Sequence, residues 1–211
     1  MVSTAIDVAD VSFGDVGPDT ATKARKRLLD AAGAYERERF GDARRMLESV
    51  NRLAPDVPEV LELMGLCAYR TRHWKKAINE LGRFHELTGS VDQHPVIADS
   101  HRAMKHWNAV EDTWTELAAA SPHPAILEEG RIVLAGAKAD QGRIQDAIRI
   151  LENANRTRPK KPKIHHLRSW YALADLYERA GIVGNARRLF ADIAQADPDF
   201  GDAAKRSANL K

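Results

Sequence analysis

The chain has 211 residues, a net charge of +2, a hydrophobic content of 44% and a charged content of 29%. These values are typical of a soluble folded protein, and the small net charge creates no global field that would attract nucleic acid or a membrane surface. The single cysteine, Cys67, excludes a disulfide framework and disfavours a thiolate metal site, and no apolar run approaches the ~20 residues needed to cross a bilayer.

Residues 1–21 predict a mobile acidic N-terminal tail. They contain no lysine or arginine, and Gly14, Gly17 and Pro18 disfavour a continuous helix. The acidic residues of this segment are Asp7, Asp10, Asp15 and Asp19. The N-terminus has neither a basic start nor an apolar stretch, so it does not resemble a secretory signal, and we expect a cytoplasmic protein.

From residue 22 onward the pattern is helical and periodic. A small anchor residue recurs at intervals of 34, 33, 37 and 39 residues, at Ala43, Ala77, Val110, Ala147 and Ala186. Three residues before each anchor stands a bulky apolar residue: Phe40, Trp74, Trp107, Ile144 and Val183. Twelve residues before each anchor stands a small one: Ala31, Gly65, Ala98, Ala135 and Ala174. These constant offsets predict five helical hairpins that stack, because one hairpin cannot bury its own apolar face.

The clearest hairpin lies between Trp170 and Pro198. One face of its first helix would carry, at i, i+3, i+4 and i+7, the residues Trp170, Leu173, Ala174 and Tyr177. Ala186 and Phe190 follow at i, i+4 on a second helix, which Pro198 ends. This spacing resembles the tetratricopeptide repeat (TPR) signature, with Ala174 where the pattern prefers glycine.

The chain is therefore similar to TPR proteins, and residues 95–99 and 132–142 also resemble uncharacterised actinobacterial members. The resemblance implies an all-α fold, a right-handed α-solenoid that occupies residues 22–211. Its TPR units would be 24–57, 58–90, 91–124, 128–161 and 167–200, followed by a capping helix at 201–210. In that cap, Asp202, Lys205, Arg206 and Asn209 would face water.

The resemblance also implies a binding surface, because the first helices of TPR units line a concave groove. The side chains at the corresponding positions are Tyr69, Arg70, Asp99, Arg102, Arg168, Tyr171, Asp175 and Arg179. Aromatic and arginine side chains are typical of surfaces that bind a peptide or a partner protein. The alternative interpretation is that Asp99–Arg102 and Asp175–Arg179 are surface ion pairs along one helix.

A basic linker, residues 156–168, joins the fourth and fifth units. It contains no acidic residue, and its basic patch consists of Arg156, Arg158, Lys160, Lys161 and Lys163. Such a patch either contacts phosphate, as in an RNA-associated accessory protein, or is a solvated loop. No aromatic side chain precedes Trp170 in this segment, so stacking of bases has no platform.

No motif indicates catalysis. The sequence has no Walker loop, no Gly-x-Ser-x-Gly and no Rossmann fingerprint, so we expect no enzyme activity and no cofactor. No histidine pair shows the i, i+4 spacing with a supporting glutamate that a helical zinc site uses, so we expect no metal. The expected partner is a protein or peptide and not a membrane, and the expected oligomeric state is a monomer or a weak homo-oligomer.

Overall fold

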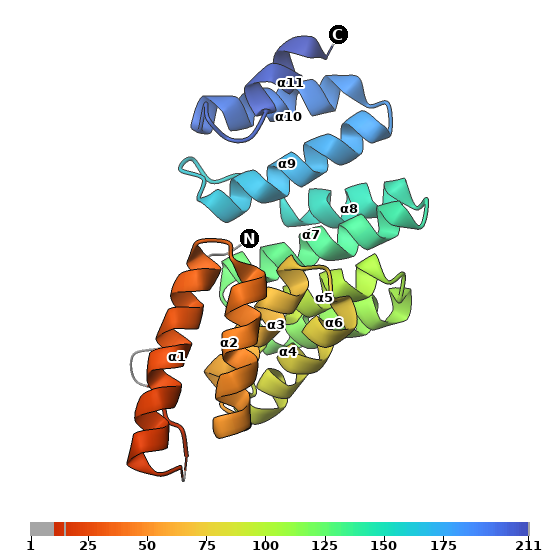
Figure 1. Cartoon of the computed structure of the whole chain (residues 1–211). Coiled ribbons are helices and arrows are strands. Elements are labelled where there is room, and N and C mark those ends of the chain that lie inside the picture. Colours follow the sequence, from red (N-terminus) through yellow and green to blue (C-terminus); the bar gives the residue numbers. More distant parts are fainter. Residues whose placement is uncertain (1–10, 15, 211) are drawn as a thin grey trace. The chain divides into compact units, whose positions relative to one another are not determined.

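The computed structural model describes residues 11–14 and 16–210, and this part of the chain folds into eleven α-helices without a strand (Figure 1). They are α1 (Pro18–Glu36), α2 (Phe40–Leu53), α3 (Pro58–Arg70), α4 (Trp74–Thr88), α5 (His94–Ala103), α6 (Trp107–Ala120), α7 (Pro124–Asp140), α8 (Ile144–Ala154), α9 (Ile164–Arg179), α10 (Val183–Ala196) and α11 (Ala203–Asn209). The predicted all-α class is confirmed. Among the described helices, none combines the length and apolar character that crossing a bilayer requires.

The second helix of every predicted hairpin begins at the bulky residue of the sequence pattern. Helices α2, α4, α6, α8 and α10 start at Phe40, Trp74, Trp107, Ile144 and Val183. The anchor residues are fully buried, with 0% exposure at Ala43, Ala77, Val110, Ala147 and Ala186. Small side chains at these positions let α2 pack on α1, α4 on α3, α8 on α7 and α10 on α9.

The turns inside the hairpins also repeat. The residue five before each anchor has a positive φ: Glu38 (58°), Arg72 (60°), Lys105 (60°), Gly142 (78°) and Gly181 (74°). The next residue donates its backbone N–H to the carbonyl five residues earlier; His73 to Ala68 (2.8 Å) and Ile182 to Tyr177 (2.8 Å) are examples. This is the Schellman pattern that closes a helix end, so the position five before the anchor also belongs to the repeat.

Three first helices begin earlier than we predicted. Helices α1, α7 and α9 start at Pro18, Pro124 and Ile164, whereas the predicted units began at 24, 128 and 167. Proline begins α1 and α7, and it suits the first turn of a helix because its missing N–H would have no partner within the helix. His123 caps α7, since its Nδ1 accepts a hydrogen bond from the N–H of Ala125 at 3.2 Å. The residues assigned to longer linkers therefore partly lengthen helices.

The folded part of the chain also begins before residue 22, which corrects the predicted boundary of the tail. Val11 and Phe13 are buried in the core of the first hairpin, 2% and 6% exposed. Arg25 in α1 secures this segment, because its Nη2 donates to the Val11 carbonyl at 3.0 Å and its guanidinium stacks over Phe13. The rest of the predicted mobile tail, residues 1–10 and 15, lies outside the described residues.

The chain divides into two compact units between His106 and Trp107. The N-terminal unit contains α1 to α5, and the C-terminal unit contains α6 to α11. The division falls inside the predicted third repeat, 91–124, where the sequence pattern gives no signal for it. Each unit has its own hydrophobic cluster.

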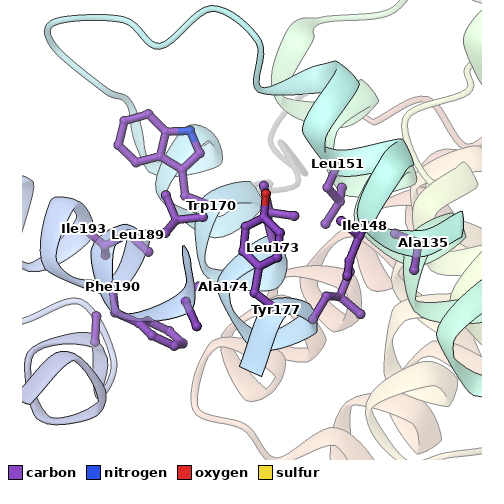
Figure 2. Packing of buried hydrophobic residues seen from close by; sticks show 14 of the residues in the cluster. Ala135, Ile148, Leu151, Trp170, Leu173, Ala174, Tyr177, Leu189, Phe190 and Ile193 are labelled. Carbon is purple, nitrogen blue, oxygen red and sulfur yellow. The ribbon is translucent and has the colours of Figure 1, made fainter. Parts of the chain in front are cut away.

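The core of the C-terminal unit surrounds α9 (Figure 2). Trp170, Leu173 and Ala174 on this helix lie between side chains of α8 and α10. Phe190 on α10 is 0% exposed and packs edge-on against the ring of Tyr171. The apolar stripe predicted from the Trp170–Pro198 spacing is therefore the centre of this core.

Cys67 lies in the core of the N-terminal unit and is expected to be unreactive in the folded protein. Its side chain is 0% exposed, and burial raises the pKa of its thiol to about 12. At pH 8 only about one thiol in 10⁴ is then ionised, and the thiolate is the reactive form. We expect no labelling by a thiol reagent at pH 8 in buffer and complete labelling in urea. Complete labelling of the native chain within minutes would contradict the structure.

Candidate functional site

The predicted binding residues lie on the first helices of the hairpins, and we call the surface that these helices form within one unit the A-helix face of that unit. In the N-terminal unit, Tyr69 on α3 and Asp99 on α5 meet across two repeats. The Tyr69 hydroxyl donates to Asp99 Oδ2 at 2.7 Å, and Arg102 Nη1 pairs with Asp99 Oδ1 at 3.3 Å. Burial, followed by the Asp99 charge, raises the pKa of Tyr69. These three side chains form one hydrogen-bonded group.

Arg70 belongs to a second group beside the first. Its guanidinium stacks over the Phe40 ring at 4.4 Å and pairs with Glu38 Oε1 at 2.9 Å. Phe40 in turn packs edge-on against Tyr35, with ring centroids 5.2 Å apart. From the sequence alone, Phe40 is recognisable only as a bulky helix-start residue. Its place under Arg70 requires two neighbouring hairpins to be packed, which no local pattern specifies.

Acidic residues lie in the first half of α3 and just before α5. Glu62 on α3 accepts a hydrogen bond from Gln93 Nε2 at 2.6 Å. Burial raises the pKa of Glu62, and the nearby Asp92 and Glu59 charges raise it further. On α3, the carboxylates of Glu59 and Glu62 thus lie nearer the start of the helix and Arg70 lies at its end.

In the C-terminal unit, Arg168 on α9 reaches Glu129 on α7. Arg168 Nε lies 2.9 Å from Glu129 Oε1, and both side chains are largely buried. Burial raises the pKa of Glu129, and the Arg168 charge opposes that rise. Arg168 is therefore committed to an ion pair between two repeats, and its role is at least partly structural.

The largest difference from the prediction concerns Arg206. We expected it to face water, but its side chain is only 20% exposed and folds back onto α9. It donates to Asp175 Oδ1 (2.9 Å), to Glu178 Oε2 (2.6 Å) and to the Tyr171 hydroxyl (3.2 Å). Burial alone would lower the pKa of Arg206, but these three hydrogen bonds raise it.

Tyr171 and Arg179 complete this part of the face. The Tyr171 hydroxyl donates to Asp202 Oδ1 at 2.5 Å, and burial together with this bond raises the pKa of Tyr171. Arg179 is more exposed, 46% for its side chain, and its Nη1 lies 3.9 Å from Asp175 Oδ2. The two carboxylate–arginine pairs that the sequence offered as alternatives, Asp99–Arg102 and Asp175–Arg179, both form.

The basic patch is solvent-exposed throughout. Arg158 pairs with Asp192 Oδ2 at 2.6 Å and stacks over the Trp170 ring, centroid distance 5.5 Å. The other four basic residues of the patch make no ion pair within the described residues: Arg156, Lys160, Lys161 and Lys163. Trp170 is 4% exposed, so its ring offers no surface to a base.

Two surface hollows lie elsewhere. The first, ≈ 450 Å³, is on the N-terminal unit and is lined by Lys23, Lys26, Arg27, Asp30 and Leu53. The second, ≈ 600 Å³, is on the C-terminal unit and is lined by Gly184, Arg187, Arg188, Ala191 and Ser207. Neither is lined by a side chain of the predicted groove or of the basic patch.

Solved structures of TPR proteins share this fold. TTC0263, a thermophilic TPR protein of Thermus thermophilus, superposes with a TM-score of 0.64 at 17% identity, over 89% of this chain and 98% of that one. MamA of Desulfovibrio magneticus RS-1 gives 0.63 at 16% identity, over 90% and 99%. PilF of Pseudomonas aeruginosa gives 0.62 at 13% identity, over 91% and 84%. No protein-family model and no curated protein matches the chain in sequence. The chain has the α-solenoid fold of TPR proteins, as the repeat spacing predicted.

Proposed function

We propose that the chain is a non-catalytic protein-interaction module that binds an extended segment of a partner protein on its A-helix face. The observation that carries this proposal is the pair of groups on α3 and α5. Tyr69 and Arg102 both bond to Asp99, and the Arg70 guanidinium lies over the Phe40 ring. Side chains fixed in this way lose little entropy when a ligand binds.

The same face suggests the chemistry of the ligand. Arg70 and Arg102 present guanidinium groups near the helix ends, and these groups bind carboxylates in a bidentate manner. The half-buried rings of Tyr69 and Phe40 beside them offer apolar contact area. We therefore expect the bound segment to combine acidic side chains with apolar ones.

The test is capture of partners from the source cell on the immobilised full chain, followed by mass spectrometry. The site variant is Arg70→Glu with Arg102→Glu. The matched control is Arg187→Glu with Arg188→Glu, which changes the net charge equally at two exposed positions on α10. We expect the site variant to lose partners that the control retains. If it keeps every partner that the wild type captures, the proposal is wrong.

A second candidate function is RNA binding through the basic patch. What favours it is that Arg156, Lys160, Lys161 and Lys163 are exposed without ion pairs in the described structure. Binding of a labelled single-stranded RNA should weaken steeply with salt and disappear when Lys160, Lys161 and Lys163 are changed to Glu. Absence of binding at low ionic strength would exclude this function.

A further inference from the structure

The guanidinium of Arg206 sits in a site built by α9 and α10. Its Nη2 bonds to Asp175 Oδ1 and to Glu178 Oε2, its Nε also bonds to Glu178 Oε2, at 3.1 Å, and its Nη1 bonds to the Tyr171 hydroxyl. The guanidinium carbon lies 4.3 Å from the Phe190 ring centroid and 5.4 Å from that of Tyr171. Two carboxylates and two aromatic rings therefore surround one cation.

The helix that supplies this cation is short. Helix α11 has seven residues, and Ala203 is its only buried side chain. So short a helix has little stability of its own, and small apolar contacts add little to it. Phe200 before it and Leu210 after it are only partly buried. Helix α11 packs on α10, and Asp202 before it accepts a hydrogen bond from Tyr171; Arg206 adds four hydrogen bonds to this attachment.

The walls of the site, in contrast, belong to long helices that are fixed by the core. Phe190 is fully buried, and Tyr171, Asp175 and Glu178 stand on α9. Tyr171 and Asp175 are also two of the residues that the repeat pattern predicted for partner binding. The arrangement is thus a rigid site on the first helix of the last hairpin, with a side chain from the short helix α11 inside it.

We propose that Tyr171, Asp175, Glu178 and Phe190 form a binding pocket for an arginine side chain of the partner, and that Arg206 occupies this pocket until the partner displaces it. The proposal rests on the proposed function, because it names a contact that the same partner would make with the C-terminal unit. Exchange of one arginine for another preserves the charge and the hydrogen bonds of the pocket. The partner's other contacts with the chain then decide whether its arginine displaces Arg206.

The pocket selects arginine over lysine. Three nitrogen atoms of one planar group make the four hydrogen bonds, while the face of that group lies against the rings. An ammonium group has no plane to stack and cannot span Asp175, Glu178 and Tyr171 in this geometry. Replacing arginine by lysine in a ligand should therefore weaken binding at least ten-fold.

The attached Arg206 also competes at a high effective concentration, which lowers the apparent affinity of any outside ligand. The probe is a fluorescent peptide with the sequence of residues 199–211, which carries Arg206 in its own context, and the readout is anisotropy. The Arg206→Ala variant of the full chain should bind this peptide at least ten-fold more tightly than the wild type. A peptide with Arg206→Lys should bind the variant at least ten-fold more weakly.

Adding Asp175→Asn and Glu178→Gln to the Arg206→Ala chain should abolish the gain in affinity for the peptide. Circular dichroism verifies that each variant is folded, and Arg206→Lys replaces Arg206→Ala if the latter unfolds. The proposal is overturned if emptying the pocket does not tighten binding, or if the arginine and lysine peptides bind equally. Loss of partners on Arg70→Glu with Arg102→Glu would still support the proposed function in that case. If the peptide binds as expected but the Arg70→Glu, Arg102→Glu variant keeps every partner, the arginine pocket is supported and the proposed function is wrong.

Discussion

Replacement of Gly65 by alanine is expected to lower the free energy of unfolding by about 2 kcal/mol, although alanine is the better helix former. Gly65 lies in α3, where that helix crosses α4. An added Cβ would stand 2.5 Å from Leu81 Cγ and 3.3 Å from the Leu81 backbone nitrogen. Leu81 is fully buried, so it cannot move aside without disturbing the core. The helices must separate, and the cost of overpacking exceeds the propensity gain of about 1 kcal/mol.

Gly82→Ala is the matched control. Gly82 lies inside α4 of the same unit, and no heavy atom stands within 4 Å of a Cβ built there. The same chemical change should raise stability by about 0.5–1 kcal/mol, because alanine orders more easily in a helix. Urea unfolding followed by circular dichroism measures both. Effects of the same sign at the two positions would refute the close crossing of α3 and α4.

Phe190→Ala is expected to cost about 3–5 kcal/mol and to produce the largest loss of stability in the C-terminal unit. Phe190 is fully buried, contacts the ring of Tyr171 and supports the guanidinium of Arg206. Its removal leaves a cavity between α9 and α10 and takes away one aromatic wall of the arginine site. We therefore expect α11 to detach as well, which proteolysis near the C-terminus would detect.

The control for this variant is Phe200→Ala. Phe200 is only partly buried, and its ring centroid lies 6.0 Å from that of Tyr171. Its truncation should cost about 1 kcal/mol or less, because water already reaches part of the ring. Thermal unfolding of the two variants under one set of conditions gives the comparison. Equal losses would mean that the core does not depend on Phe190 as described.

The fold was predictable from the sequence because its determinants are local. A bulky residue, a small anchor three residues later and a Schellman turn before them recur in every hairpin, as with Trp74, Ala77 and Arg72. These positions decide where helices start and where they cross. The starts of α1, α7 and α9 were missed because extra residues between repeats can lengthen a helix as well as a loop, and the repeat pattern does not distinguish the two.

The candidate site was predictable only as a set of positions. Tyr69 and Asp99 are 30 residues apart, and Tyr171 and Arg206 are 35 apart, so their hydrogen bonds depend on how separate helices pack. From the sequence, Arg206 resembles a solvent-facing residue of a polar helix, because its neighbours in the chain do not indicate that it packs beside Asp175 and Glu178 of α9. The contact between Phe40 and Arg70 was missed for the same reason. Contacts between repeats require the tertiary structure.

The division into two units gives the molecule two separate natural reporters. Cys67, the only thiol, lies in the N-terminal unit, whereas Trp107, Trp114 and Trp170, three of the four tryptophans, belong to the C-terminal unit. Thiol labelling therefore follows the opening of one half of the chain, and intrinsic fluorescence mainly follows the other. If the halves unfold independently, the two signals will change at different urea concentrations; if they unfold together, the two curves will coincide. The unmodified chain thus reveals how far its cooperativity extends.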